Sequence, residues 1–289
     1  MALPLFTPWQ NNPFAFVNKA VKFDMGDSSS NLLILPGSLT VTGTNNVFFK
    51  SAVGNILSGN FNTIIRGGSE LSSGSSNTNL GGGLSTITSG SGNTSLGVGI
   101  LNDASVPINM SNIVGIGYTA LQNNQGLYNT AVGYEALFPN TTGTNNTAAG
   151  GFAMNLLTSG SFNVAIGYEA LQASSLASSS YNVAIGRAAL QIGGNYCVGI
   201  GNSFGLSTAN GNTGVGVDSG HAIATGSQNS AFGVSALVKC TQANNSTGIG
   251  GNACEGATSS TITNCTGIGG ASLVNITNGT SDSVPTQKQ

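Results

Sequence analysis

NVAIGYEAL at residues 163–171 returns as NVAIGRAAL at 182–190, and NTAVGYEAL at 129–137 precedes both. Weaker copies are NTSLGVGIL at 93–101, NSAFGVSAL at 229–237 and CTGIGGASL at 265–273. A repeat this short cannot bury its apolar residues alone, and neighbouring repeats must stack to build a continuous core. The period therefore predicts a stacked β-solenoid, which is typical of a rod or fibre rather than of a catalyst.

The repeats align on the residue that follows each central apolar pair, here called the anchor position. Successive anchors lie 15 to 20 residues apart. They are Lys50, Arg66, Gly81, Gly97, Gly117, Gly133, Gly150, Gly167, Gly186, Gly201, Gly216, Gly233, Gly250 and Gly269. Glycine at this position suits a turn with positive φ or a close approach of two backbones. Lys50 and Arg66 therefore predict a different turn in the first coils, and Asn31–Leu35 is a candidate for one coil before them.

Two apolar columns precede the anchors. The large apolar column, one residue before the anchor, comprises Phe49, Ile65, Leu80, Leu96, Ile116, Val132, Ala149, Ile166, Ile185, Ile200, Val215, Phe232, Ile249 and Ile268. The small column, two residues before the anchor, is Ala or Gly from Gly115 onward: Gly115, Ala131, Ala148, Ala165, Ala184, Gly199, Gly214, Ala231, Gly248 and Gly267. A small–large pair recurs three and four residues after many anchors, as in Ala136-Leu137 and Ala170-Leu171.

Neighbouring side chains on a strand point to opposite faces, so these pairs predict two short strands in each coil, with both faces apolar. We expect the large apolar column to fill the interior of the solenoid. We expect the small column to let another copy of the backbone approach closely, so that Ala165→Leu would overfill a contact between chains.

An asparagine column stands four residues before the anchors. Its members are Asn31, Asn46, Asn62, Asn77, Asn93, Asn129, Asn146, Asn163, Asn182, Asn212 and Asn229. Stacked Asn amides can hydrogen-bond along a ladder, and Asn also tolerates turn geometry. Both interpretations are structural.

Composition excludes several classes of function. Charged residues are 6% of the chain, against about 25% in typical domains. A net charge of −2 with seven Lys and Arg offers no basic surface for nucleic acid or for an anionic membrane. No apolar run approaches the roughly 18 residues of a membrane span. The start of the chain, Met1–Pro4, lacks the basic and apolar regions of a secretory signal, which predicts synthesis in a cytosol without standard export.

Cysteine and histidine usage does not favour a metal site. Cys197, Cys240, Cys254 and Cys265 form no CxxC pair, and His221 is the single histidine. The favoured interpretation is four small apolar residues in or near the core. The alternative is a disulfide between Cys254 and Cys265.

The repeat divides the chain into three parts. Residues 1–30 break the period and contain Trp9, four phenylalanines and three prolines, so they predict an arm that attaches the rod to another protein or caps its first coil. Residues 31–275 form the rod, and residues 276–289 are predicted to be a polar C-terminal tail.

The three strongest motifs resemble the head repeats of trimeric autotransporter adhesins, which are similar to repeats in tail-fibre proteins of phages and large viruses. The resemblance covers most of 46–275. It implies a left-handed parallel β-roll, here of about 14–15 coils, with three chains side by side about the fibre axis. The chain lacks the signal peptide, heptad stalk and membrane-anchoring barrel of the adhesins, which favours the virion fibre.

Three patterns contain residue types that are used in nucleotide binding or catalysis. Glycines at 199/201/205 and 214/216/220 depart from the dinucleotide fingerprint, and no helix pattern follows them. Asp218, Ser219 and His221 are triad residue types, but neighbours on one strand point apart. Glu135 and Glu169 share one repeat position two coils apart, which is roughly 10 Å and near or beyond the spacing of about 6.5–9.5 Å in inverting glycosidases.

Tyr118, Tyr134 and Tyr168 also share one position, and they predict an aromatic stripe for sugar stacking or for packing at an interface. We predict no catalytic, metal-binding or cofactor-binding residue.

These observations predict an all-β homotrimeric fibre on the surface of a virus or phage particle, attached through residues 1–30 and binding a host receptor or glycan. The alternative is a bacterial trimeric surface adhesin fragment or a filament subunit. A third class is an ice-binding solenoid, favoured by a threonine column that Val164 and Val183 interrupt. The predicted partners include neither nucleic acid nor an inserted membrane.

Overall fold

The computed structural model describes residues 32–34, 43–49, 58–65, 73–82, 89–100, 109–172, 178–191, 194–202, 210–221, 223, 225–280 and 283–285. The predicted arm, residues 1–30, lies outside these ranges, and so do Lys50 and Arg66.

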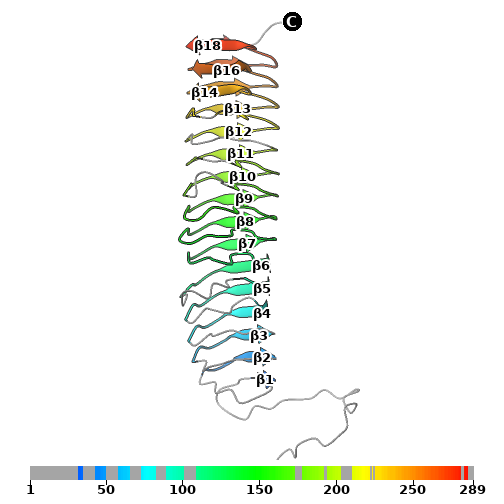
Figure 1. The fold of residues 1–289 in the computed structure, drawn as a ribbon, viewed down its shortest axis with the longest axis vertical. Helices are drawn as coiled ribbons and strands as arrows, with labels where there is room; N and C mark the ends of the chain where they lie inside the picture. The colour runs from blue at the N-terminus through cyan, green and yellow to red at the C-terminus, as the bar shows by residue number, and fades with distance from the viewer. Residues whose placement is uncertain are drawn as a thin grey trace, which may run out of the picture.

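The described residues wind as a parallel β-solenoid and include no helix. Figure 1 shows the strands stacked along one rod. They are β1 (Leu32–Ile34), β2 (Val47–Phe49), β3 (Thr63–Ile65), β4 (Thr78–Gly82), β5 (Thr94–Val98), β6 (Val114–Tyr118), β7 (Thr130–Val132), β8 (Thr147–Ala149), β9 (Val164–Ile166), β10 (Val183–Ile185), β11 (Val198–Ile200), β12 (Thr213–Val215), β13 (Ser230–Phe232), β14 (Cys240–Asn244), β15 (Thr247–Ile249), β16 (Gly256–Thr263), β17 (Thr266–Ile268), β18 (Ile276–Thr280) and β19 (Ser283–Pro285). The predicted all-β class and the predicted parallel solenoid are confirmed.

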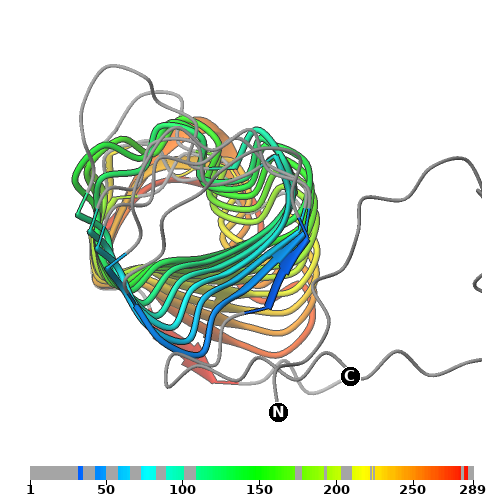
Figure 2. The ribbon, with the colours of Figure 1, turned by 90° about the horizontal axis from the view of Figure 1, so that it is seen from below.

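The main sheet has 16 parallel strands, which run in chain order from β1 to β13 and then through β15, β17 and β19. Register pairs the same repeat position in successive coils, so that Ala165 of β9 lies between Ala148 of β8 and Ala184 of β10. A shift of one residue would turn every side chain to the opposite face. Seen along the axis, successive coils have a similar outline and turn gradually about the axis (Figure 2), so each sequence column runs along the rod.

A second sheet of three parallel strands, β14, β16 and β18, forms at the C-terminal end of the rod. The last two strands, β18 and β19, pair with β16 and β17. Both fall within 276–289, for which the sequence predicted a tail beyond the rod, so the sheets continue to Pro285. The open edge of a coil offers unpaired backbone N–H and C=O groups, and these pair with a polar segment as readily as with an apolar one.

The small column faces the interior of the solenoid. Ala131, Ala148, Ala165 and Ala184 are fully buried within the single chain. The large apolar column points outward, and its most exposed members, between 36% and 47% exposed, are Ile65, Leu80, Leu96, Val132, Ile166, Ile200, Phe232, Ile249 and Ile268. The predicted assignment of the two faces is therefore wrong. Ala165→Leu would overfill the inside of the chain and not a contact between chains.

Large side chains from the far side of each coil explain why the inward strand positions are small. These side chains stand four residues after the anchor and are fully buried; examples are Leu121, Leu137, Leu171, Leu190 and Leu237. A Cβ added to Gly115 would lie 3.5 Å from Cδ1 of Leu121 and 2.6 Å from Cγ2 of Ile100. Because protein interiors are close-packed, the strand can place only Ala or Gly against these leucines.

The small–large pair after the anchor forms a turn in the central coils. Ala136 and Leu137 are both fully buried, whereas strand neighbours would face opposite ways. The φ angles of Glu135 and Leu137 are 49° and 53°, in the left-handed region that strands do not use. The backbone still bonds from coil to coil, since Leu137 N–H donates to the carbonyl of Ala153 at 2.8 Å. The prediction of a second strand is wrong for these coils.

The anchor glycines have both features predicted for them, a positive φ angle and a close approach to the backbone of the next coil. From Gly81 to Gly269 their φ angles lie between 112° and 139°, a region that L side chains rarely adopt. A Cβ on Gly167 would also lie 2.4 Å from the carbonyl oxygen of Gly186 in the next coil. Any larger residue would strain its own backbone and push two coils apart.

Candidate functional site

The asparagine column forms a buried hydrogen-bonded ladder beside the main sheet. Asn163 Nδ2 donates to Oδ1 of Asn146 at 3.0 Å and to the carbonyl of Ser179 at 2.9 Å. Its Oδ1 accepts the backbone N–H of Asn182 at 3.0 Å and Nδ2 of Asn182 at 3.1 Å. A carboxamide has two donor hydrogens and two acceptor sites, so this buried side chain is fully satisfied. The predicted amide ladder is confirmed.

The ladder is interrupted at Ile113 and at Cys197, and it is not continued beyond Asn229, where Ser246 and Cys265 hold the same position. Ile113 and Cys197 occupy the asparagine position, and their backbone N–H groups donate to Oδ1 of Asn93 at 3.1 Å and of Asn182 at 2.8 Å. Neither side chain carries a carboxamide that could pass the ladder to the next coil. The amide ladder therefore stops at Ile113 and at Cys197, restarts one coil later at Asn129 and Asn212, and ends at Asn229.

A second polar ladder, which the sequence analysis missed, runs six residues before the anchors. Ser161 N–H donates to Oγ of Ser180 at 2.9 Å, and Ser180 N–H donates to Oδ1 of Asn195 at 2.7 Å. Asn195 N–H in turn donates to Oδ1 of Asn210 at 2.7 Å. The signal was the recurrence of Ser, Thr or Asn at Thr44, Asn60, Ser75, Ser91, Ser111, Thr144, Ser161, Ser180, Asn195, Asn210, Ser227 and Asn244.

The outward face of the main sheet is an uncharged surface that follows the rod. The large apolar column lies on it, and two residues earlier along each strand stands a Thr, Ser or Val, such as Thr130, Val164 or Val183. Val164 and Val183 lie in the main sheet beside threonines, and they interrupt the threonine column as the sequence predicted. A row of exposed apolar side chains of this kind is a candidate interaction surface.

The predicted tyrosine stripe is present and includes a residue that the prediction lacked. The Tyr118 and Tyr134 rings stack with centroids 5.7 Å apart. Phe152 makes edge contacts with Tyr134 at 5.1 Å and with Tyr168 at 5.8 Å. Phe152 was missed because it stands one position later in its repeat than the tyrosines. The carboxylate of Glu135 raises the pKa of Tyr134 above its ordinary value, by a side-chain hydrogen bond and by its charge.

A second aromatic ladder follows a corner of the rod. We name the residues five before the anchors, directly ahead of the asparagine column, the corner column. Phe162 and Tyr181 stack with centroids 5.0 Å apart and planes within 7°, and Tyr181 and Tyr196 stack at 4.9 Å within 4°. All three have φ between 59° and 61°. The sequence signal was an aromatic residue at this position in three successive coils.

Asp218, Ser219 and His221 do not converge. Ser219 is buried and its hydroxyl donates to the carbonyl of Ala231 at 2.9 Å inside the rod. His221 is exposed, and its backbone N–H donates to the carbonyl of Asp218 at 3.3 Å. A serine facing the core and a histidine facing solvent cannot exchange a proton.

Glu135 and Glu169 lie two coils apart, as predicted, with Phe152 at the same repeat position between them. Glu135 N–H donates to Tyr118, Phe152 N–H to Tyr134 and Glu169 N–H to Gly151. Nδ2 of Asn155 also donates to Oε2 of Glu135 at 3.2 Å. Phe152 at the intervening position packs its ring against Tyr134 and Tyr168.

The glycine pairs belong to the structure of the coils. Gly199 and Gly214 lie in β11 and β12, and Gly201 and Gly216 are anchors. No helix follows them among the described residues. Gly205 lies outside those residues.

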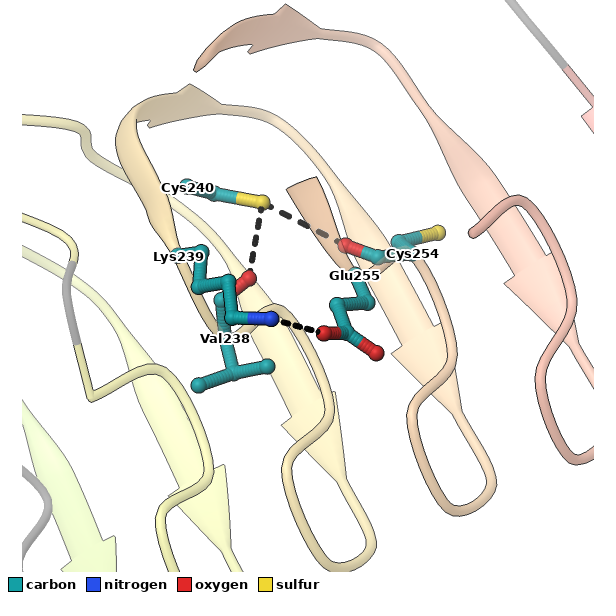
Figure 3. A network of polar contacts seen from close by, with 5 residues as sticks. All are labelled: Val238, Lys239, Cys240, Cys254 and Glu255. Atoms are coloured by element: carbon teal, nitrogen blue, oxygen red, sulfur yellow. Dashed lines mark hydrogen bonds and ion pairs between the residues drawn. The ribbon is translucent and has the colours of Figure 1, made fainter. Parts of the chain in front are cut away.

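The four cysteines are buried and none forms a disulfide. Figure 3 shows Cys240 Sγ near the carbonyl oxygens of Val238 and Cys254, at 3.6 Å and 3.3 Å. A hydrogen bond with the thiol of Cys265, and then burial, raise the pKa of Cys254 well above its ordinary value. Burial likewise raises the pKa of Cys197. These thiols are part of the core, which is the interpretation that the sequence favoured.

One ion pair crosses between coils beside the cysteines. Lys239 Nζ lies 2.5 Å from Oε1 of Glu255 (Figure 3), and the side chain of Lys239 is exposed. Such surface pairs contribute up to about 1 kcal/mol. Within the described ranges no three His, Cys, Asp or Glu side chains are grouped to hold a metal ion. No helix in that part of the chain is suited to crossing a membrane.

The arrangement can therefore present an apolar sheet face, two aromatic ladders and polar corners along a rod. Comparison of the chain with protein-family models, with curated proteins and with solved structures found no match.

Proposed function

We propose that the chain is the fibre protein of a virus or phage particle, in which three copies associate side by side as left-handed β-rolls. The observation that carries this proposal is the large apolar column, which faces outward along the main sheet. Soluble proteins rarely leave a continuous apolar surface uncovered. A second copy of the chain is the partner with the matching period.

The gain from covering this column is substantial. Full burial of a Val, Leu or Ile side chain stabilises a protein by about 1.5–3 kcal/mol. Ile166 is 44% exposed in the single chain, so covering the rest of it contributes roughly 1 kcal/mol. The same gain recurs at Ile200, Ile249 and Ile268, and a symmetric assembly repeats it in every chain.

Support for the virus particle and for the host as partners comes from the sequence. The resemblance of the repeat to tail-fibre proteins supports a place on the virion surface. The aromatic residues of segment 1–30 suit an attachment to a particle protein, since aromatic side chains are favoured anchors at interfaces. The coils then project from the particle and contact a host receptor or glycan. The proposal involves no enzyme activity and no cofactor.

The oligomeric state is tested by light scattering on the purified chain. The wild-type protein is expected at three times the chain mass of 28.7 kDa. Ile166→Lys with Ile200→Lys places two charges on the covered face, and each buried unpaired charge costs several kcal/mol, so the double variant is expected to be a folded monomer. Gln228→Lys, on the corner column, is the matched control and should stay trimeric. A wild-type mass of one chain would refute the assembly.

The location is tested by immunogold electron microscopy with an antibody raised against the coils. Labelled fibres on virus or phage particles are expected for the full chain, and no label for a chain that lacks residues 1–25. Label on a bacterial surface would favour the adhesin alternative instead.

A further inference from the structure

The stacked rings of the corner column end at Tyr196. This side chain is 64% exposed, the largest value among the exposed apolar and aromatic side chains of the described residues. The next coil continues the backbone ladder, since Gly211 N–H donates to the carbonyl of Asn195 at 2.9 Å. Gly211 has no side chain to continue the ring stack, and Gln228 follows it in the column. One face of the Tyr196 ring is therefore left without a ring on it.

The described residues leave room beside that face. Among them, a Cβ added to Gly211 would meet Cγ of Gln228 alone, at an ordinary contact distance of 3.7 Å. Tyr196 and Gln228 are two coils apart, roughly 10 Å at the usual strand spacing. Carbon atoms pack at about 4 Å, so one puckered ring fits between the two side chains in contact with both.

Carboxamides surround this place. Asn195 and Asn210 directly precede Tyr196 and Gly211, and their Oδ1 atoms accept backbone N–H groups at 2.7 Å. Their Nδ2 groups, and the side-chain amide of Gln228, make no hydrogen bond within the described residues. The corner column carries no charged residue from Asn45 to Asn264. An aromatic floor with neutral donors at its rim does not favour an ion.

We propose that the gap between Tyr196 and Gln228 binds one neutral sugar residue of a glycan, stacked on the Tyr196 ring. A pyranose presents C–H groups on its face and hydroxyl groups around its edge, which matches a flat ring bordered by amides. The choice of a host-surface glycan as the source rests on the proposed function. An aromatic side chain of a second copy is the competing occupant.

Saturation-transfer NMR with three probes tests the gap: methyl glucopyranoside, N-acetylglucosamine and the anionic N-acetylneuraminic acid. The wild-type protein is expected to transfer saturation to at least one neutral probe and not to the anion. Tyr196→Ala removes the stacking surface and should weaken binding about ten-fold or more. Tyr128→Ala is the matched control, because Tyr128 is an exposed tyrosine in the same column with Asn112 and Asn145 in the adjacent coils.

Gly211→Asn fills the gap without straining the backbone. Gly211 has a φ of 68°, and Asn45, Asn112 and Asn145 hold the same column position with φ between 57° and 59°. This variant should fold as the wild type does and lose binding about ten-fold. The proposal is overturned if neither neutral probe binds, if the anion alone binds, or if Tyr196→Ala or Gly211→Asn binds as wild type.

Light scattering on the same samples separates this inference from the proposed function. A trimer that binds no neutral sugar refutes the sugar site alone and indicates that Tyr196 serves contacts within the assembly. A monomer that binds sugar through Tyr196 refutes the trimer alone.

Discussion

Replacing Ala165 by Leu is expected to destabilise the chain itself. Ala165 is fully buried, its strand neighbours are Ala148 and Ala184, and the opposite wall is filled by side chains such as Leu171. An isobutyl group in place of a methyl group has no space there. Overpacking of a filled core costs about 1–3 kcal/mol, and this cost falls on each chain whether or not it is assembled.

Guanidinium unfolding, followed by circular dichroism, measures the effect. The midpoint of Ala165→Leu should fall by an amount equivalent to about 1–3 kcal/mol. Ile166→Leu is the matched control, because Ile166 is the adjacent residue on the opposite, outward face. Its free energy of unfolding should change by less than about 0.5 kcal/mol.

The opposite result would refute the assignment of faces. If Ala165→Leu unfolded at the wild-type midpoint and yet dissociated the assembly in light scattering, the small column would face a partner chain. The packing of Leu171 and its equivalents against that column would then be wrong.

Two further predictions concern the interior of the rod. Asn163→Ala leaves the backbone N–H of Asn182 and the carbonyl of Ser179 without their side-chain partner. The free energy of unfolding should therefore fall by at least about 1–3 kcal/mol. The control Gln191→Ala should lower it by less than about 0.5 kcal/mol. Because the folded-state pKa of Cys254 is raised, the stability that its neutral thiol contributes is complete below the ordinary value of 9.0 and is lost as pH rises above it. The drop in unfolding midpoint between about pH 8 and about pH 10 should therefore be smaller in Cys254→Ala than in the wild type; equal drops would contradict this.

The period, the register and the amide ladder could be predicted from sequence because each depends on what recurs at one position. Asn163 bonds to the same residue type in the coils before and after it, and Gly167 meets Gly186. A match between identical positions is visible in the repeat itself. The Ser and Asn ladder that contains Ser180 and Asn195 was open to the same reasoning.

Which face of the strand is inside could not be predicted from the strand alone. A small residue beside a large one, as in Ala165-Ile166, alternates in the same way whichever residue faces the core. Leu171 determines which face of the strand is inside, because its left-handed backbone, with a φ of 48°, turns its side chain into the core. Strand periodicity contains no information on that turn. The candidate sugar site beside Tyr196 was likewise not predicted, because it depends on the absence of a side chain at Gly211.

The interruptions of the amide ladder set the tensile limit of the rod. Bonds between coils run along the axis, so an axial pull loads the coil interfaces in series, and the whole rod holds no more than its weakest junction. The alkyl side chain of Ile113 cannot hydrogen-bond to the next coil, whereas Asn163 is joined to Asn182. Cys197 and Ser246 offer a thiol and a hydroxyl group in place of the amide. Among the described coils, we expect a rod under load to part first at the junction after Ile113 and to leave the segments on either side wound.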